Sequence, residues 1–131
     1  MAGKLILVVD DEKDIAEIVS DILRGEEFET TLAYDGQEAL TAMRRLRPDA
    51  MVLDIKMPVL DGLQVIRHMQ ADPSLQGIPT VVLTATRVIE ELEQEFRQYH
   101  VHSWISKPFE PEELIRCVTQ ALRSKENPGH A

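Results

Sequence analysis

The chain has 131 residues, 44% hydrophobic and 28% charged, which suits one globular domain and leaves little room for a second. Its 23 acidic and 14 basic residues give a formal net charge of −9, so DNA phosphates would repel it and direct nucleic-acid binding is not expected. The sequence shows no membrane span and no signal-peptide pattern, and the single Cys117 excludes an internal disulfide, so a cytoplasmic location is expected.

Strand-like and helix-like segments alternate from the N-terminus onwards. The apolar run Leu5–Val9 predicts a strand buried on both faces. Apolar residues at helical spacing from Ile15 to Leu23 predict a helix. The weak alternation from Phe28 to Tyr34 suits an outer strand, and a second helical stripe from Ala39 to Leu46 stops before Pro48.

The same alternation continues toward the C-terminus. Five βα units in sequence predict a parallel sheet with helices on both faces, joined by right-handed crossovers. We expect one domain over residues 1–124 and a polar tail over residues 125–131. The remaining predicted elements are strands at Ala50–Leu53, Thr80–Thr84 and Ser103–Ser106, and helices at Leu63–Met69, Leu92–Tyr99 and Leu114–Leu122.

Polar side chains follow or end four of the predicted strands, at the edge where α/β sheets bind ligands. Asp10 and Asp11 follow the first strand, Asp54 follows the third, Thr84 ends the fourth and Lys107 follows the fifth. Any one of these residues alone could simply cap a helix or lie in a solvated loop. Three carboxylates together need a cation to offset their repulsion, and hard oxygen ligands suit Mg²⁺ better than zinc.

This set of residues also suits phosphoryl transfer. A carboxylate can attack phosphorus and form an acyl phosphate. The phosphoryl oxygens must then be held by a metal ion, an ammonium group and a hydroxyl or amide group. Asp54, Asp11, Lys107 and Thr84 supply these parts, so the sequence predicts that Asp54 accepts a phosphoryl group.

Four motifs, in order along nearly the whole chain, resemble the receiver domain of bacterial two-component response regulators. The resemblance implies a flavodoxin-like sheet of strand order 2-1-3-4-5. It also implies that Asp54 takes the phosphoryl group from a histidine kinase or a histidine phosphotransfer protein. A downstream protein partner would bind the face formed by the fourth helix, fifth strand and fifth helix. The motifs are Val8–Glu12, Val52–Pro58 with Asp61–Gly62, Val82–Ala85 and Lys107–Phe109.

The resemblance implies roles for individual residues. Lys107 and Thr84 would contact the phosphoryl oxygens, and Lys107–Pro108 would be a cis peptide. The implied Mg²⁺ ligands are Asp11, Asp54 and the backbone carbonyl of Lys56, with Asp10 acting through water.

Two positions depart from the usual family pattern. The aromatic residue that would switch together with Thr84 is Trp104, which is bulkier than the usual Tyr or Phe. His100 stands where the family usually has Gly, so a left-handed helix cap is expected on a less favourable residue.

Two other functions are compatible with a nucleophilic Asp at this place in the fold. Aspartyl-phosphate phosphohydrolases and mutases also place a nucleophilic Asp after a strand, but they typically need a second Asp two positions on, where this chain has Lys56. A degenerate receiver that binds partners without phosphorylation is the other alternative, although the phosphorylation residues are all present. The expected function is a phosphoacceptor that is not a turnover enzyme, read most simply as a stand-alone receiver that acts by protein contact.

Overall fold

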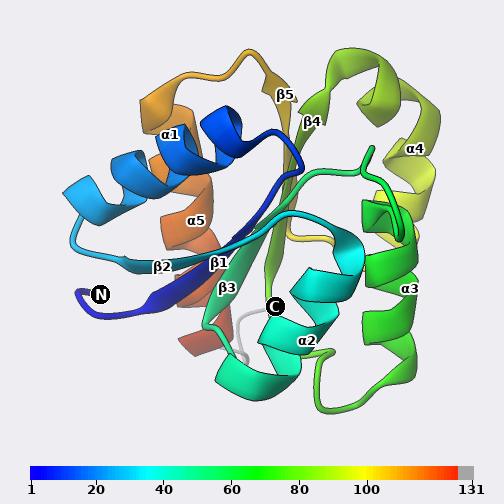
Figure 1. Ribbon diagram of the computed structural model, residues 1–131, viewed down its shortest axis with the longest axis horizontal. Coiled ribbons are helices and arrows are strands. Elements are labelled where there is room, and N and C mark those ends of the chain that lie inside the picture. Colours follow the sequence, from blue (N-terminus) through cyan, green and yellow to red (C-terminus); the bar gives the residue numbers. More distant parts are fainter. Residues whose placement is uncertain (127–131) are drawn as a thin grey trace.

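The computed structural model, described here over residues 1–126, alternates strands and helices in the predicted order (Figure 1). The residues from 127 to 131, which belong to the predicted tail, lie outside this described range. The elements are β1 (Leu5–Val9), α1 (Lys13–Gly25), β2 (Glu29–Ala33), α2 (Gly36–Leu46), β3 (Ala50–Leu53), α3 (Gly62–Ala71), β4 (Thr80–Ala85), α4 (Thr86–Gln98), β5 (Ser103–Lys107) and α5 (Pro111–Glu126).

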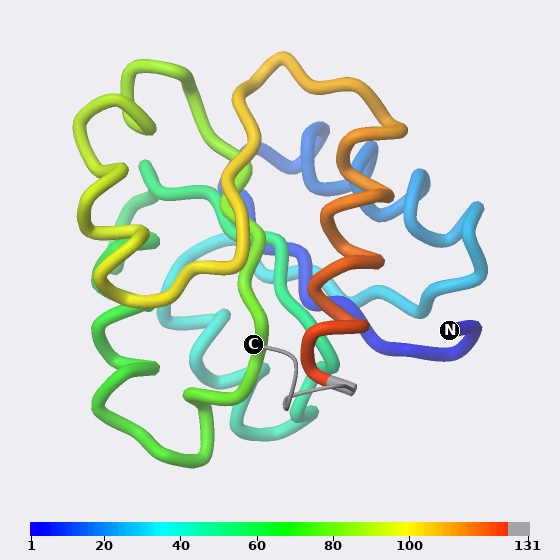
Figure 2. Tube along the Cα trace, turned by 180° about the vertical axis from the view of Figure 1, so that it is seen from behind, coloured from blue at the N-terminus to red at the C-terminus, as the bar shows by residue number. Residues whose placement is uncertain are grey.

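The strands form one parallel sheet in the order β2-β1-β3-β4-β5. This order confirms the predicted flavodoxin-like fold. Helices α1 and α5 lie side by side on one face of the sheet, and α2, α3 and α4 cover the other face (Figures 1 and 2). The sheet is therefore the middle layer of three.

Successive residues of β1 show why the central strands are apolar throughout. Leu7 and Val9 pack in the core beneath α2, α3 and α4, whereas Ile6 and Val8 pack in the core beneath α1 and α5. Side chains alternate across a strand, and helices cover both faces, so every position in the strand must be apolar.

The helices α2 and α3 begin earlier than their apolar stripes predicted. The Asp35 side chain accepts a hydrogen bond from the Glu38 amide at 2.8 Å and starts α2 at Gly36. Asp61 and Gln64 form a reciprocal capping box at the start of α3. Polar capping residues fix these starts, and hydrophobic periodicity does not register them.

Three features toward the C-terminus bear on the predictions. His100 has a φ of 58°, so it adopts the left-handed conformation expected after α4. Lys107–Pro108 is a cis peptide bond, as the resemblance implied. Helix α5 continues to Glu126, so Lys125 and Glu126, the first residues of the predicted tail, are helical. Within residues 1–126, no helix is long and apolar enough to cross a membrane.

Candidate functional site

The parallel pairing of β1 with β3 brings two of the acidic residues together. Val9 lies opposite Leu53 at the ends of these strands, so the next residues, Asp10 and Asp54, emerge side by side at the carboxyl edge of the sheet. The Asp54 amide donates to the Val9 carbonyl at 3.0 Å, which extends the pairing to the site itself. This is the edge that the sequence predicted.

Asp10, Asp11 and Asp54 form a compact group of carboxylates. Each offers an oxygen within 4.8 Å of the other two. Asp10 and Asp54 are buried, with 3% and 6% of their surface exposed, whereas Asp11 is exposed. Charges this close repel one another, and burial strengthens the repulsion because less water screens it. The group therefore favours binding of a cation.

Lys107 partly offsets this negative charge. Its Nζ donates to Asp10 Oδ2 at 2.7 Å and to Asp54 Oδ2 at 3.1 Å, and it lies 4.0 Å from Glu12 Oε1. Burial alone would lower the pKa of Lys107, but the hydrogen bond to Asp10 and the charges of Asp54 and Asp10 outweigh it. The net effect raises the pKa of Lys107, so the ammonium form persists between the two carboxylates.

The position of Asp10 disfavours its ionised form. Burial raises the pKa of Asp10, and the nearby charge of Asp54 adds to this effect. Hydrogen bonds from Lys107 and from the Glu12 amide, which is 2.9 Å from Asp10 Oδ1, act in the opposite direction without cancelling it. The ionised site is therefore under electrostatic strain that a second cation would relieve.

The loop after β3 holds Asp54 in place. Asp54 Oδ1 accepts a hydrogen bond from the Ile55 amide at 2.7 Å. The Gly62 amide donates to the Ile55 carbonyl at 2.8 Å, and a Cβ atom at Gly62 would come within 2.3 Å of the Asp54 carbonyl oxygen. Gly62 is needed because the chain folds back against Asp54 this closely. Lys56 lies within this loop, and its side chain is exposed.

Thr84 and Trp104 differ in how they relate to the acidic group. Thr84 lies one residue before the end of β4, and 1% of its surface is exposed. Trp104 is half-buried beside α4, where its ring centroid is 5.8 Å from that of Phe96 and the Arg97 guanidinium lies 5.2 Å above it. Trp104 thus packs against α4.

Two features of the site were not assigned from the sequence. Glu12 approaches Lys107 although 95 positions separate them, and its only sequence signal was its place directly after Asp10 and Asp11. The hydroxyl groups of Thr86 and Ser106 form a hydrogen bond that joins the start of α4 to β5. Hydroxyl residues after a strand are too common in sequences to predict that pair.

An open groove of about 510 Å³ adjoins the site between α1 and the segment before α5. It is mostly apolar, and Ile18 within it is 50% exposed. The lining residues are Glu12, Ile15, Ile18, Ile22, Lys107, Pro108, Phe109 and Pro111.

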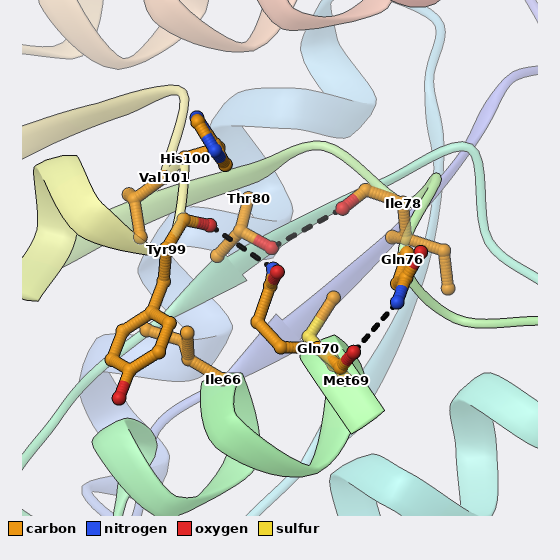
Figure 3. A pocket seen from close by; sticks show the side chains of 9 residues that line it. All are labelled: Ile66, Met69, Gln70, Gln76, Ile78, Thr80, Tyr99, His100 and Val101. Atoms are coloured by element: carbon orange, nitrogen blue, oxygen red, sulfur yellow. Dashed lines mark hydrogen bonds between the residues drawn. The ribbon is translucent and has the colours of Figure 1, made fainter. Parts of the chain in front are cut away.

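A smaller pocket of about 230 Å³ lies at the opposite edge of the sheet, where β4 begins (Figure 3). Two glutamines on its wall are tied to the backbone: Gln70 Nε2 donates to the Tyr99 carbonyl at 3.0 Å, and Gln76 Nε2 donates to the Gln70 carbonyl at 2.6 Å. Since this pocket lies at the amino ends of the strands, it is separate from the acidic group.

Comparisons with known proteins agree with this geometry. Residues 6–119 match the response regulator receiver domain. The chain is 42% identical over 126 residues to the DNA-binding response regulator MtrA of Mycobacterium tuberculosis, covering 93% of this chain and 52% of that protein. It is 37% identical over 118 residues to the probable transcriptional regulatory protein TcrX of the same organism, covering 90% of this chain and 49% of that protein. The chain therefore spans about half the length of the curated relatives it matches.

Solved structures show the same likeness. The receiver domain of the sensor histidine kinase PA1611 from Pseudomonas aeruginosa has a TM-score of 0.84 at 30% identity, covering 94% of this chain and 100% of that one, and it holds a magnesium ion in its active-site cleft. The chemotaxis response regulator CheY4 of Vibrio cholerae has a TM-score of 0.83 at 29% identity, covering 92% of this chain and 99% of that one.

The crowding of the carboxylates predicts that one of them destabilises the metal-free fold. Lys107 bonds Asp10 and Asp54, so Asp11→Ala removes a repulsive charge without disturbing either hydrogen bond. The substitution should raise the free energy of unfolding in EDTA by about 1 kcal/mol or less, as measured by thermal melts. An excess of Mg²⁺ should stabilise the wild type more than the variant. A metal-free variant that melts below the wild type would contradict the argument from crowding.

Proposed function

The chain belongs to the family of response regulator receiver domains of two-component signalling, and we propose that Asp54 accepts a phosphoryl group from a histidine kinase or a histidine phosphotransfer protein. The observation that carries this proposal is the Lys107 ammonium, hydrogen-bonded to both Asp54 and Asp10 at the carboxyl edge of the sheet. It places a fixed positive charge beside a carboxylate nucleophile, where a phosphoryl group would need it.

Mg²⁺ fits the donors present at this site. The three carboxylate oxygens lie close enough together to share one ion, and such oxygen ligands suit Mg²⁺. We propose that Asp11, Asp54 and the backbone carbonyl of Lys56 hold the ion, with Asp10 acting through water. When bound, Mg²⁺ supplies positive charge against the oxygens of a phosphoryl group.

The proposed reaction is a transfer between two covalent partners. A bond forms between an Asp54 carboxylate oxygen and phosphorus, the bond from phosphorus to the donor nitrogen breaks, and its electron pair goes to that nitrogen. The Lys107 ammonium would move its hydrogen bond from Asp54 to the phosphoryl oxygens, where the negative charge then lies. The Thr84 hydroxyl would donate a hydrogen bond to the same oxygens. Thr84 lies near the end of β4, which pairs with β3, and Lys107 ends β5, which pairs with β4, so both lie at the same edge of the sheet as Asp54.

We propose that the domain is not a turnover enzyme. A phosphohydrolase would need a general base that accepts a proton from water beside the acyl phosphate. Lys56, two positions after Asp54, carries an ammonium group and cannot accept a proton. Membership of the receiver family also disfavours the phosphohydrolase or mutase alternative. A degenerate receiver is disfavoured because Asp54, Asp11 and Lys107 are all present at the site.

The groove beside α1 is the proposed contact for the protein that donates the phosphoryl group. It is open and apolar, and Lys107 belongs to both the groove and the acidic site. A donor that buries Ile18 in its interface would thus bring its phosphoryl group to the mouth of the site. The downstream protein partner would bind another surface, formed by α4, β5 and α5, and would respond there to the phosphorylation of Asp54.

The proposal concerns a receiver domain over residues 1–124, in the cytoplasm and without direct contact to nucleic acid. DNA binding is named for MtrA, and this chain matches about half of that protein.

The assignment of Asp54 as the acceptor predicts that a substitution at this position abolishes phosphorylation. Asp54→Asn should keep the fold and abolish phosphorylation by acetyl phosphate in Mg²⁺, because a neutral amide is a far weaker nucleophile than a carboxylate. Intact-protein mass spectrometry before and after hydroxylamine treatment would detect the acyl phosphate. Asp14→Asn, an exposed change on α1, is the matched control and should react like the wild type. Wild-type labelling of Asp54→Asn would show that the acceptor is another residue.

Lys56 should slow the loss of the phosphoryl group. Its ammonium can donate to phosphoryl oxygens but cannot orient water as a base. Lys56→Asn should therefore speed autodephosphorylation several-fold, a barrier change of about 1 kcal/mol, measured by mass spectrometry after removal of the donor. Arg116→Asn removes an exposed positive charge on α5 and should leave the rate unchanged. Equal rates in Lys56→Asn and the wild type would place the Lys56 side chain away from the phosphoryl group.

Thr84 and Trp104 should link phosphorylation to the surface of α4. Beryllofluoride with Mg²⁺ mimics the phosphoryl group, and it should draw the Thr84 hydroxyl toward the site and let Trp104 turn into the vacated space. The emission of Trp104, the sole tryptophan, should shift or be quenched. Thr84→Ala should blunt this change while Mg²⁺ still binds.

Thr80→Ala is the matched control, since Thr80 is a buried threonine at the far end of the same strand. It should leave the emission change intact. Identical Trp104 emission with and without the mimic, at proven saturation, would mean that Trp104 is a fixed anchor for a partner.

A further inference from the structure

Glu12 carries a carboxylate at the mouth of the site, and the proposed reaction assigns this carboxylate no role. Its amide donates to Asp10 Oδ1 at 2.9 Å, and its carbonyl accepts from the Ala16 amide at 3.0 Å. It occupies the N-cap position of α1, yet its side chain makes no capping hydrogen bond. Side chains at that position usually bond the first-turn amides. The backbone of Glu12 is thus held firmly while its carboxylate remains available to the site.

The position of this carboxylate relates it to the nucleophile. Lys107 Nζ lies 4.0 Å from Glu12 Oε1 and 3.1 Å from Asp54 Oδ2. The Glu12 and Asp54 carboxylate oxygens are therefore no farther apart than the sum of these two distances. An attacking oxygen stands about 3 Å from the phosphorus, and the leaving atom lies one bond farther. When the donor enters from the side of Glu12, its leaving group would thus come within reach of the Glu12 carboxylate.

Glu12 also faces the side from which a donor would enter. With 66% of its side chain exposed, it lines the open groove together with Lys107. The Lys107 ammonium hydrogen-bonds to Asp10 and Asp54 and is too far from Glu12 for a hydrogen bond. The Glu12 oxygens can therefore accept hydrogen bonds from an incoming molecule.

We propose that Glu12 is a specificity-determining residue that favours donors whose leaving group is a protonated nitrogen over donors whose leaving group is an anionic oxygen. This inference rests on the proposed role of Asp54. The Glu12 carboxylate accepts a hydrogen bond from the N–H of the leaving group and attracts its positive charge. The same carboxylate repels a leaving group that departs as a carboxylate anion.

The two kinds of donor differ in where the electrons go. In both, an oxygen of Asp54 bonds to phosphorus. With phosphoramidate or phosphoimidazole the P–N bond breaks, its electron pair goes to nitrogen, and the group, which already carries its proton, departs as ammonia or imidazole. With acetyl phosphate the P–O bond breaks, the electron pair stays on oxygen and acetate departs. Only the nitrogen donors offer Glu12 an N–H group.

The test compares donors rather than absolute rates. Phosphorylation of Asp54 by phosphoramidate and by acetyl phosphate is followed by intact-protein mass spectrometry at saturating Mg²⁺, with pH and ionic strength fixed. In Glu12→Gln the ratio of the phosphoramidate rate to the acetyl phosphate rate should fall about five-fold, the upper range for a solvent-exposed charge pair. Asp14→Asn removes one negative charge from the first turn of the same helix and should leave the ratio unchanged.

Two results would overturn the inference. The first is a wild-type ratio in Glu12→Gln, including the case in which both rates change equally, as expected if Glu12 only steadies Lys107. The second is an equal fall of the ratio in Glu12→Gln and Asp14→Asn, which would reflect the general negative field of α1. If neither donor phosphorylates the wild type, the proposed function itself fails, and the inference fails with it.

Discussion

The site depends on one ammonium group shared between two buried carboxylates. Lys107 lies within hydrogen-bonding distance of Asp10 and of Asp54, and neither acid has another cation within such reach among the contacts of residues 1–126. The two raised pKa values have different origins: burial and the charge of Asp54 raise the pKa of Asp10 against the hydrogen bond from Lys107, whereas the two carboxylates raise the pKa of Lys107 against burial. A single cation cannot fully satisfy two anions, so the arrangement is ready to bind further positive charge.

The fold creates this arrangement from distant parts of the chain. Parallel strands send their carboxyl ends to one edge, and the order β2-β1-β3-β4-β5 makes β1, β3 and β4 neighbours although they are far apart in sequence. Continuous apolar runs in these strands bury both faces and fix the strand ends, and the polar residues just beyond those ends then lie together. Site geometry is thus a consequence of core packing.

Much of this could be read from the sequence, and the reasons for the exceptions are physical. The bounds of β1 and β3 were predicted because an apolar run ends sharply at an aspartate. The start of α2 was predicted late because Gly36 and the capping Asp35 carry no hydrophobic signal. The contact of Lys107 with Glu12 depends on how far two long side chains reach, and the stacking of Arg97 on Trp104 depends on helix placement. A linear pattern encodes neither.

The way Lys107 is shared also explains how one covalent change could spread through the domain. Phosphorylation would add about one further negative charge at Asp54 and three acceptor oxygens, so the sharing of Lys107 between Asp54 and Asp10 would shift toward the phosphoryl group. Lys107 ends β5, three residues after Trp104, and β5 pairs along its length with β4, which carries Thr84. Trp104 is only half-buried against Phe96, so burying it further is open to the chain. A redistribution of charge at Lys107 and a half-exposed side chain at Trp104 would thus meet on the same strand, where a change at the site could bias the position of that side chain.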